Sequence, residues 1–189
     1  MKVLGIVCSP RKEGNTEILV REALEAVKEA GHETEIVLVA DKDIAPCDAC
    51  GGCQGDGVCK IDDDMQTIYK QMEQADGIIF GTPVYFLNVT AQAKAVIDRT
   101  YPFLTEGKLR GKVAAAIVVA RRVGAGQVLS LLYTYFVAQR MIIAGGGIGY
   151  GREKGEVKQG VGGVQTFTAL QEARTVGRNV ARMMQRVSK

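Results

Sequence analysis

Residues 3–16 read Val-Leu-Gly-Ile-Val-Cys-Ser-Pro-Arg-Lys-Glu-Gly-Asn-Thr, so a short apolar run is followed at once by a polar loop that contains a glycine. The apolar run, residues 3–8, shows no alternation with polar residues, which is typical of a strand buried on both faces of a parallel sheet. Apolar residues at helical spacing follow from Ile18 to Val27, and Gly31 marks the end of that helix. The chain therefore begins with a strand, a polar loop and a helix, as doubly wound sheets do.

The same alternation of strands and helices continues along the chain. Further strands are expected at residues 35–40, 77–81, 113–120 and 141–147, and helices at about 65–72, 91–103, 129–137 and 167–186. Five strands alternating with helices predict an α/β fold with a five-stranded parallel sheet covered on both faces. Right-handed crossovers between the strands make this a flavodoxin-like three-layer sandwich.

Length and composition indicate one domain over residues 1–189, because 47% of the residues are hydrophobic and nothing reads as a linker or a repeat. The apolar run at residues 113–120 is far too short to cross a bilayer, and the first residues lack the features of a signal peptide. We therefore expect a cytoplasmic protein with no membrane partner, in which thiols stay reduced. The net charge of +3 is too small to indicate nucleic-acid binding.

Polar side chains in the loop after the first strand are candidates for anion binding. Ser9, Asn15 and Thr16 offer hydroxyl and amide donors, and Arg11 adds a positive charge. The start of a helix directs free backbone amides and the positive end of its dipole to the same point. An ordinary helix cap formed by Asn15 or Thr16 is the alternative. The position after the first strand favours a phosphate site, because mononucleotide phosphates bind there in doubly wound sheets.

Four of the five cysteines lie close together in the sequence. Cys47, Cys50 and Cys53 follow a C-x2-C-x2-C pattern, and Cys59 comes after a short loop with two glycines. Such spacing directs successive thiolates at one compact object, as in proteins that hold iron-sulfur clusters. The alternatives are zinc, which usually has two C-x2-C pairs with a longer spacer, and a non-binding loop that oxidises in air. We interpret the insertion at about residues 41–62 as a cluster-binding loop.

The loop from Pro83 to Asn88 follows the third predicted strand, and ligands of open parallel sheets bind at the carboxyl ends of strands. Tyr85 and Phe86 could flank a flat ring there, or they could simply cover the core. The phosphate loop on an adjacent strand favours the ring-binding interpretation. Arg121 also follows the carboxyl end of a strand, where it faces either a cofactor or substrate, or solvent.

Two other segments have simpler interpretations. Asp62, Asp63 and Asp64 precede a predicted helix whose dipole favours acidic side chains in its first turn, so no metal is assigned to them. The segment from Tyr150 to Gln165 is rich in glycine and in charged residues, and we expect it to form a loop or lid.

Together the motifs resemble those of the iron-sulfur flavoproteins, within the broader NADPH-dependent FMN reductase group of flavodoxin-like proteins. The resemblance rests on Ser9-Pro10-Arg11 with Gly14-Asn15-Thr16, on the four clustered cysteines, and on Gly81-Thr82-Pro83-Val84-Tyr85-Phe86 with Asn88. It implies that FMN is bound through its phosphate by Ser9, Arg11, Asn15 and Thr16, and through its ring by Pro83, Val84, Tyr85, Phe86 and Asn88, with Arg121 as a further candidate. It also implies a 4Fe-4S cluster on Cys47, Cys50, Cys53 and Cys59, and a homodimer or homotetramer.

Pairing a flavin with a cluster couples two-electron carriers to one-electron carriers, while the protein supplies positioning and electrostatics. We therefore expect an FMN- and 4Fe-4S-containing oxidoreductase that transfers electrons between a ferredoxin-like carrier and a small-molecule acceptor. One alternative is an FMN or quinone reductase with NAD(P)H as donor and no functional cluster. A second is a redox or metal sensor. No side chain is assigned as a catalytic acid or base.

Overall fold

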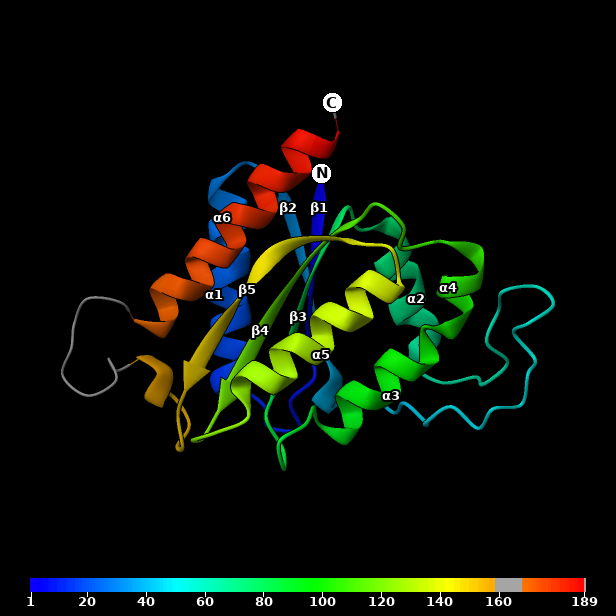
Figure 1. Ribbon diagram of the computed structural model, residues 1–189, viewed down its shortest axis with the longest axis horizontal. Helices are drawn as coiled ribbons and strands as arrows, with labels where there is room; N and C mark the ends of the chain where they lie inside the picture. Colours follow the sequence, from blue (N-terminus) through cyan, green and yellow to red (C-terminus); the bar gives the residue numbers. More distant parts are fainter. Residues whose placement is uncertain (159–167, 189) are drawn as a thin grey trace.

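The computed structural model describes residues 1–158 and 168–188, and within them five strands form one sheet (Figure 1). The strands are β1 (Lys2–Val7), β2 (Glu33–Leu38), β3 (Gly77–Pro83), β4 (Val113–Ala120) and β5 (Ile142–Tyr150). Their order is β2-β1-β3-β4-β5, and every neighbouring pair is parallel. This is the flavodoxin-like order, in which the direction of winding reverses between β1 and β3. The predicted fold class is confirmed.

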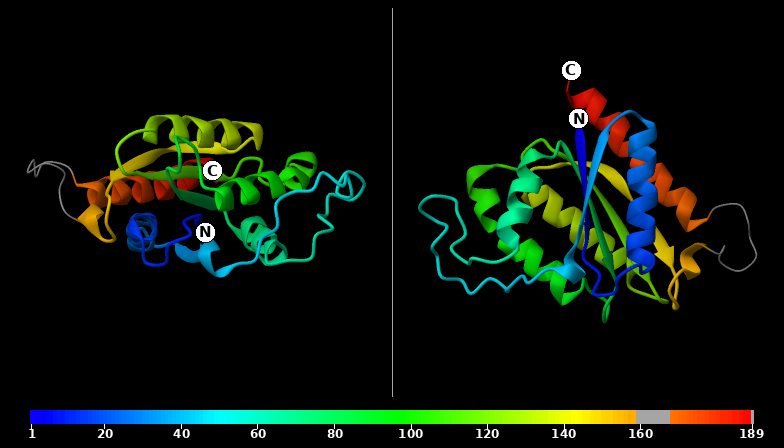
Figure 2. Two further views of the ribbon diagram at one scale, coloured as in Figure 1. Left: turned by 90° about the horizontal axis from the view of Figure 1, so that it is seen from below. Right: turned by 180° about the vertical axis from the view of Figure 1, so that it is seen from behind.

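Helices cover both faces of the sheet, as the two further views in Figure 2 show. They are α1 (Asn15–Glu29), α2 (Met65–Gln74), α3 (Ala91–Arg99), α4 (Tyr101–Glu106), α5 (Ala125–Ala138) and α6 (Ala169–Val187), with short 3-10 helices η1 (Val39–Asp41) and η2 (Glu156–Lys158). Helices α1 and α6 pack against one face of the sheet, and α2 to α5 against the other. Alternate residues of β4 enter the two cores, with Ala116 in one and Ile117 in the other, as the two-residue period of a strand requires.

The helix expected at residues 91–103 is interrupted. Helix α3 ends at Arg99 and α4 begins at Tyr101, with Pro102 in its first turn. Proline has no backbone N–H, so Pro102 cannot donate to the carbonyl of Asp98 and continue α3. The chain changes direction at this break, and the residues on either side of the break lie beside the cysteine-rich loop.

Other boundaries differ from the sequence-based expectation for local reasons. Strand β2 ends at Leu38 because residues 39–41 turn into η1. Strand β5 continues to Tyr150, since it pairs with β4 as far as Ala120, with one irregularity that leaves Ala144 without a partner on β4. Helix α6 begins after Thr168, which forms a capping box with Gln171. The expected first helical residue, 167, and residues 159–165 of the expected lid lie outside the described residues, while residues 150–158 include the end of β5 and the short helix η2.

Helices α1 and α6 approach each other closely at one glycine. A Cβ atom on Gly177 would lie 2.0 Å from the carbonyl oxygen of Ala23. No side chain can be accommodated at that separation, so glycine at this position sets the distance between the two helices. This close contact holds α1 and α6 together on the same face of the sheet.

The segment from residue 42 to 64 contains neither helix nor strand, and it carries the four clustered cysteines. In Figure 1 this segment, drawn in cyan, extends sideways from the sheet beyond α2 and α4. Its charged and polar residues lie largely at the surface. None of the helices in the described part of the chain combines the length and the apolar character needed to span a membrane.

Candidate functional site

The carboxyl ends of β1, β3, β4 and β5 surround a cavity of about 290 Å³. It brings together eight of the residues singled out from the sequence, namely Ser9, Arg11, Asn15, Thr16, Pro83, Val84, Tyr85 and Arg121. Phe86 and Asn88 do not line it. The cavity lies at the sheet edge and beside the β1/β3 switch point where ligands of open α/β folds bind.

The loop after β1 leaves the start of α1 open. The N-cap residue of α1 is Gly14, and no side chain caps the first amides. Ser9 lies under the loop, where its Oγ accepts a hydrogen bond from the backbone N–H of Arg11 at 3.2 Å. The ordinary cap considered as an alternative is therefore absent from this helix, and its first-turn amides face the cavity as an anion site requires.

The negative charge nearest this helix start is already satisfied. Glu17 is buried, and its carboxylate accepts a hydrogen bond from the backbone N–H of Glu13 at 2.6 Å and one from Nε of Arg21 at 2.8 Å. Because Arg21 also forms an ion pair with Glu17, the carboxylate presents little net repulsion to an anion in the cavity.

Asn15 fastens the segment after β5 to the start of α1. Its Nδ2 donates to the carbonyl oxygen of Glu153 at 2.8 Å, and its Oδ1 accepts from the backbone N–H of Gly155 at 2.8 Å. Lys154 forms an ion pair with Glu13 at 2.7 Å, which ties the same two segments together. Asn15 thus shapes the wall of the cavity and still has one amide hydrogen free to donate.

The segment after β5 adds residues that sequence reasoning missed. Arg152 and Lys154 line the cavity together with Arg11 and Arg121, while Glu153 is the acidic residue in the lining. Lys154 is paired with Glu13, but Arg11, Arg121 and Arg152 still outnumber Glu153 in the lining and make the cavity a favourable place for an anionic ligand. These residues could have been predicted from their position. A fifth parallel strand ends at the same edge of the sheet as the others, so the charged residues that follow it lie at the same site.

The loop after β3 makes a tight turn at the rim of this cavity. Tyr85 and Asn88 exchange backbone hydrogen bonds of 2.9 and 3.0 Å. The two residues between them have left-handed backbone, with φ of 47° at Phe86 and 66° at Leu87, which is uncommon for side chains of this size. Phe86 is fully exposed, so it does not cover the core. Strain at non-glycine residues is found where a site needs a particular loop shape.

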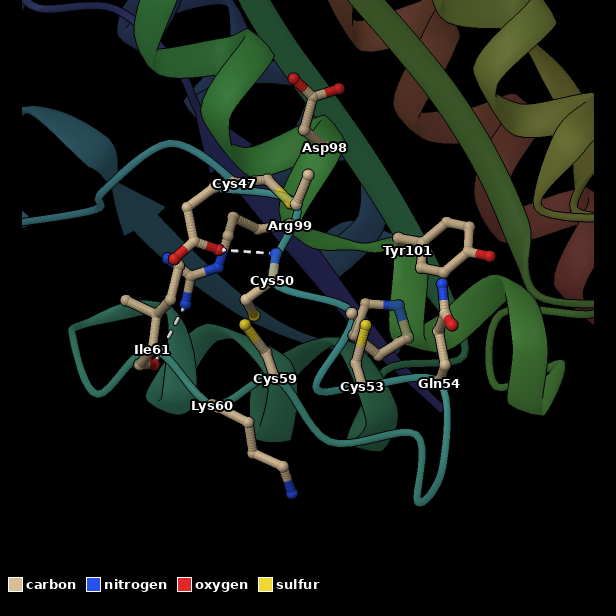
Figure 3. Close-up of a pocket in the computed structure, with 14 residues that line it drawn as sticks. Cys47, Cys50, Cys53, Gln54, Cys59, Lys60, Ile61, Asp98, Arg99 and Tyr101 are labelled. Atoms are coloured by element: carbon tan, nitrogen blue, oxygen red, sulfur yellow. Dashed lines mark hydrogen bonds between the residues drawn. The ribbon is translucent and has the colours of Figure 1, made fainter.

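The four clustered cysteines line a second cavity, of about 420 Å³, beside the ends of α3 and α4 (Figure 3). The other lining residues include Asp98, Arg99, Tyr101 and Pro102. All the cysteines are free thiols, so no disulfide occupies the loop. Burial raises the pKa of the Cys53 thiol, and repulsion from the thiolates of Cys59, Cys50 and Cys47 raises it further. Thiolates that lie close together repel one another, and a bound cationic group stabilises their charged form.

The four thiols are the donor type that both zinc sites and iron-sulfur clusters use. Among residues 1–158 and 168–188, no three side chains of the metal-ligating types gather tightly enough to hold a single metal ion. Four thiolates around one zinc ion would have to stand about 3.8 Å apart, given a Zn–S distance of about 2.3 Å and tetrahedral geometry. An iron-sulfur cluster separates its ligands more widely, because each cysteine binds a different iron. The donor set and the cavity are therefore compatible with a cluster.

A buried arginine holds the two ends of the cysteine-rich loop. The side chain of Arg99 has no exposed surface and forms a two-pronged ion pair with Asp63, with Nη1–Oδ2 at 2.6 Å and Nη2–Oδ1 at 3.0 Å. Nη1 also donates to the carbonyl oxygen of Ala45 at 2.9 Å, and Nη2 to that of Ile61 at 3.2 Å. One guanidinium thus contacts the chain where it enters the loop and where it leaves it.

Asp63 completes this junction from the other side. Its carboxylate accepts hydrogen bonds from the backbone N–H groups of Ala45 at 2.9 Å and Met65 at 3.0 Å. Burial by itself raises the pKa of Asp63, but the hydrogen bonds from Arg99 and from the two amides outweigh it and lower the pKa overall. The hydrogen bond from the N–H of Met65 is the interaction expected of an acidic residue at the start of α2. The ion pair with Arg99 was not expected from the sequence.

Hydrogen bonds within the loop fix the backbone around the cysteines. Asp48 accepts from the backbone N–H of Cys50 at 3.1 Å, which lowers the pKa of Asp48. Gln66 on α2 donates to the carbonyl oxygen of Cys59 at 3.0 Å. Lys60 lines the cavity from the solvent side, where it forms an ion pair with Asp56 at 2.5 Å. The cavity therefore has one buried and one exposed cation beside its cysteines.

The sheet order, the open helix start and the cationic cavity at the carboxyl edge define a flavodoxin-like protein with a mononucleotide-type site. The description of the family that matches residues 1–153 is NADPH-dependent FMN reductase. The chain belongs to this family and, within it, to the iron-sulfur flavoproteins, and it is accordingly a flavin-dependent oxidoreductase. The resemblance inferred from the motifs is confirmed.

Relatives support this assignment along the whole chain. An iron-sulfur flavoprotein of Methanocaldococcus jannaschii is 41% identical over 199 aligned positions, which cover 100% of each chain. An iron-sulfur flavoprotein of Methanosarcina thermophila is 41% identical over 148 positions, covering 77% of this chain and 78% of the relative.

Solved structures share the fold at low sequence identity. The flavodoxin-like WrbA-like protein of Agrobacterium tumefaciens has a TM-score of 0.65 at 17% identity, with 98% of each chain covered. The RosB structure with a bound 8-demethyl-8-formylriboflavin-5'-phosphate intermediate has a TM-score of 0.79 at 18% identity, covering 100% of this chain and 80% of RosB. These likenesses establish the architecture of the chain.

Proposed function

We propose that this chain binds FMN at the carboxyl edge of the sheet and a 4Fe-4S cluster in the cysteine-rich loop, and that it transfers electrons between a ferredoxin-like carrier and a small-molecule acceptor. The observation that carries the proposal is the presence of two separate cavities in one chain, one cationic and one lined by four free cysteines. Membership of the family supports the flavin part of the proposal.

In this proposal the FMN phosphate binds at the start of α1. Arg11 supplies charge, Ser9 orders the loop beneath it, and the first-turn amides near Thr16 donate to phosphate oxygens. Asn15 donates its remaining amide hydrogen and keeps Arg152 and Lys154 at the cavity wall. Arg121, from the loop after β4, adds charge at the opposite side of the same cavity.

The flavin ring is assigned to the loop after β3. Pro83, Val84 and Tyr85 line the cavity, and the backbone of Val84 is fixed by a 2.7 Å hydrogen bond to the carbonyl oxygen of Val119. Asn88 closes the turn, and Phe86 stands at its exposed tip, where it can cover a ring edge or meet a second subunit. Tyr85, Phe86 and Leu87 are all exposed and adjacent, and a contiguous apolar patch is typical of an interface, so we include a homodimer or homotetramer in the proposal.

The 4Fe-4S cluster is assigned to Cys47, Cys50, Cys53 and Cys59, the four thiols that line one cavity. When bound, such a cluster carries single electrons, whereas a flavin exchanges one or two. The protein fixes the loop through Arg99 and Asp63 and limits solvent at the inner wall of the cavity. Thiols that must stay reduced for assembly suit a cytoplasmic location.

The test is an anaerobic preparation in which FMN, iron and sulfide are counted per chain. We expect one FMN and about four irons and four sulfides per chain. Changing each loop cysteine to serine should remove most of the iron and leave the FMN, while Cys8→Ala should keep both, because Cys8 is buried outside the loop. FMN without iron in the unmodified chain would contradict the cluster assignment, and zinc in the loop would replace it.

The second candidate function is an FMN or quinone reductase that uses NAD(P)H and has no functional cluster. The description of the matching family favours NADPH as donor. Rapid reduction of the bound FMN by NADPH without ferredoxin, unchanged in the cysteine variants, would support this candidate. Slow reduction by NADPH together with rapid reduction by a reduced ferredoxin would support the first. A redox or metal sensor would show neither activity.

A further inference from the structure

We propose that Arg99 is a positioning residue for the cluster, which fixes the cysteine-rich loop and raises the reduction potential of the cluster through its buried positive charge. The inference rests on the proposed function, because it concerns the cluster assigned to Cys47, Cys50, Cys53 and Cys59. It adds a residue outside the cysteine motif to that site.

The first argument is location. Arg99 lines the same cavity as the four cysteines, and its side chain has no exposed surface. In Figure 3 the Arg99 side chain lies between Cys47 and Ile61, and a dashed line joins its guanidinium to the backbone of Ile61. Lys60 lines the same cavity from the solvent side, with half of its side chain exposed. A buried charge is screened far less than an exposed one. Of the buried pair formed by Arg99 and Asp63, only Arg99 lines the cavity, so the cationic end of the pair is the one nearer the cysteines.

The second argument is that Arg99 stays charged. A guanidinium is protonated throughout the physiological pH range, and Arg99 is held by the two-pronged ion pair with Asp63 at 2.6 and 3.0 Å. Reduction adds negative charge to the cluster, and a fixed positive charge beside it stabilises the reduced form.

The third argument is an unused donor. Nε of Arg99 is buried, and among the described residues it has no hydrogen-bond partner. The other two nitrogens of the guanidinium are engaged by Asp63, Ala45 and Ile61. A buried N–H without an acceptor is costly. We assign a sulfur of the bound cluster or of its cysteine ligands as the acceptor, an interaction that also raises the potential.

The test is a potentiometric titration of the anaerobic holoprotein followed by electron paramagnetic resonance of the reduced cluster. Arg99→Gln should lower the potential, because Asp63 is left without its cation. Asp63→Asn should raise it, because Arg99 is left without its anion. Each change should alter the equilibrium constant for one-electron reduction at least tenfold, which corresponds to 59 mV. Arg99→Lys keeps the charge and should retain most of the potential while holding the loop less firmly.

The matched control is Lys60→Gln, which removes an exposed cation from the same cavity and should change the equilibrium constant less than threefold. A purely structural role would loosen the loop in both the Arg99 and the Asp63 variants and shift the potential in one direction. Shifts of the same sign, or no larger than that of Lys60→Gln, therefore overturn the proposal. If Arg99→Gln retains no iron, the sign of the shift in Asp63→Asn decides, and loss of iron from Asp63→Asn as well overturns the electrostatic role.

Failure of the proposed function is recognised separately. If the unmodified chain binds no iron, the cluster assignment itself is wrong. If it binds iron and the variants behave like Lys60→Gln, the cluster assignment stands and only the role of Arg99 is wrong. Hydrogen exchange of the iron-free chain gives an independent measure of positioning, and Arg99→Gln should speed exchange in residues 45–61.

Discussion

The side chain of Asn15 and the backbone of Glu153 are joined by a hydrogen bond of 2.8 Å, which connects the first turn of α1 to the segment that follows β5. A second bond, from the N–H of Gly155 to Asn15, completes the connection. One wall of the cationic cavity thus depends on the side chain of Asn15, which joins the start of α1 to the segment after the last strand of the sheet.

Asn15→Ala should weaken FMN binding. The change removes both hydrogen bonds and releases Arg152 and Lys154 from the cavity wall. Each bond contributes about 1 kcal/mol, so we expect the dissociation constant of FMN to rise about 10- to 30-fold, as measured by quenching of FMN fluorescence. Thr175→Ala, on the exposed side of α6, is the control. An unchanged dissociation constant would remove Asn15 from the site.

Arg11→Gln should discriminate between FMN and riboflavin. If Arg11 binds the phosphate, its loss should weaken FMN binding about tenfold, the size of a charge-assisted hydrogen bond. Binding of riboflavin, which has no phosphate, should change little. Arg178→Gln, which removes an exposed arginine from α6, should affect neither ligand. Equal loss of both ligands would show that Arg11 acts on the fold of the loop and not on the phosphate.

Asp63→Asn should destabilise the iron-free chain at neutral pH, because it leaves Arg99 buried without its anion. Removing one partner of a buried ion pair costs about 3 kcal/mol. The folded-state pKa of Asp63 is lowered, so its stabilising contribution is present above the unfolded pKa of about 3.9 and is lost as the pH falls through the folded value. Urea unfolding should show the difference from the unmodified chain shrinking below about pH 4. A difference that does not depend on pH would contradict this account.

Phe86→Ser should separate association from folding. Phe86 is fully exposed, so the free energy of unfolding of the subunit should change by less than about 0.5 kcal/mol. If Phe86 lies at a boundary between subunits, light scattering should report a smaller particle at micromolar concentration. Phe103→Ser, in the buried cluster beneath α2 to α5, should instead cost about 3 kcal/mol or more. An unchanged particle mass would exclude Phe86 from a required interface.

The fold could be predicted from the sequence because its strands are continuous apolar runs. Residues 113–120 illustrate this, since every residue of β4 is buried. Boundaries were predicted less well where a local backbone event decides them. The turn into η1 shortens β2, and Pro102 divides the helix that contains Arg99. Such events depend on a few hydrogen bonds and leave little trace in an apolar pattern.

The residues that line the two cavities were predicted in part. The loops after β1 and β3 carry recognisable motifs, and the structure brings most of their residues to one edge. The roles of Arg99 and Asp63 were missed because an arginine near a helix end normally lies in solvent, and its partner is 36 residues earlier in the chain. One signal was available. Arg99 follows the buried Val96 by three positions and Ala95 by four, so it lies on the apolar face of α3.

The junction at Arg99 also bears on how such a protein can change over evolutionary time. The carbonyl groups of Ala45 and Ile61 bind the same guanidinium, so the chain departs from the sandwich and rejoins it at nearly one point. The segment between Ala45 and Ile61 can change in length or sequence with little effect on the sandwich, because the entropy of closing a loop grows only slowly with its length. The same sandwich can therefore accept loops of different length and sequence at this point, while the carboxyl edge of the sheet is left unchanged.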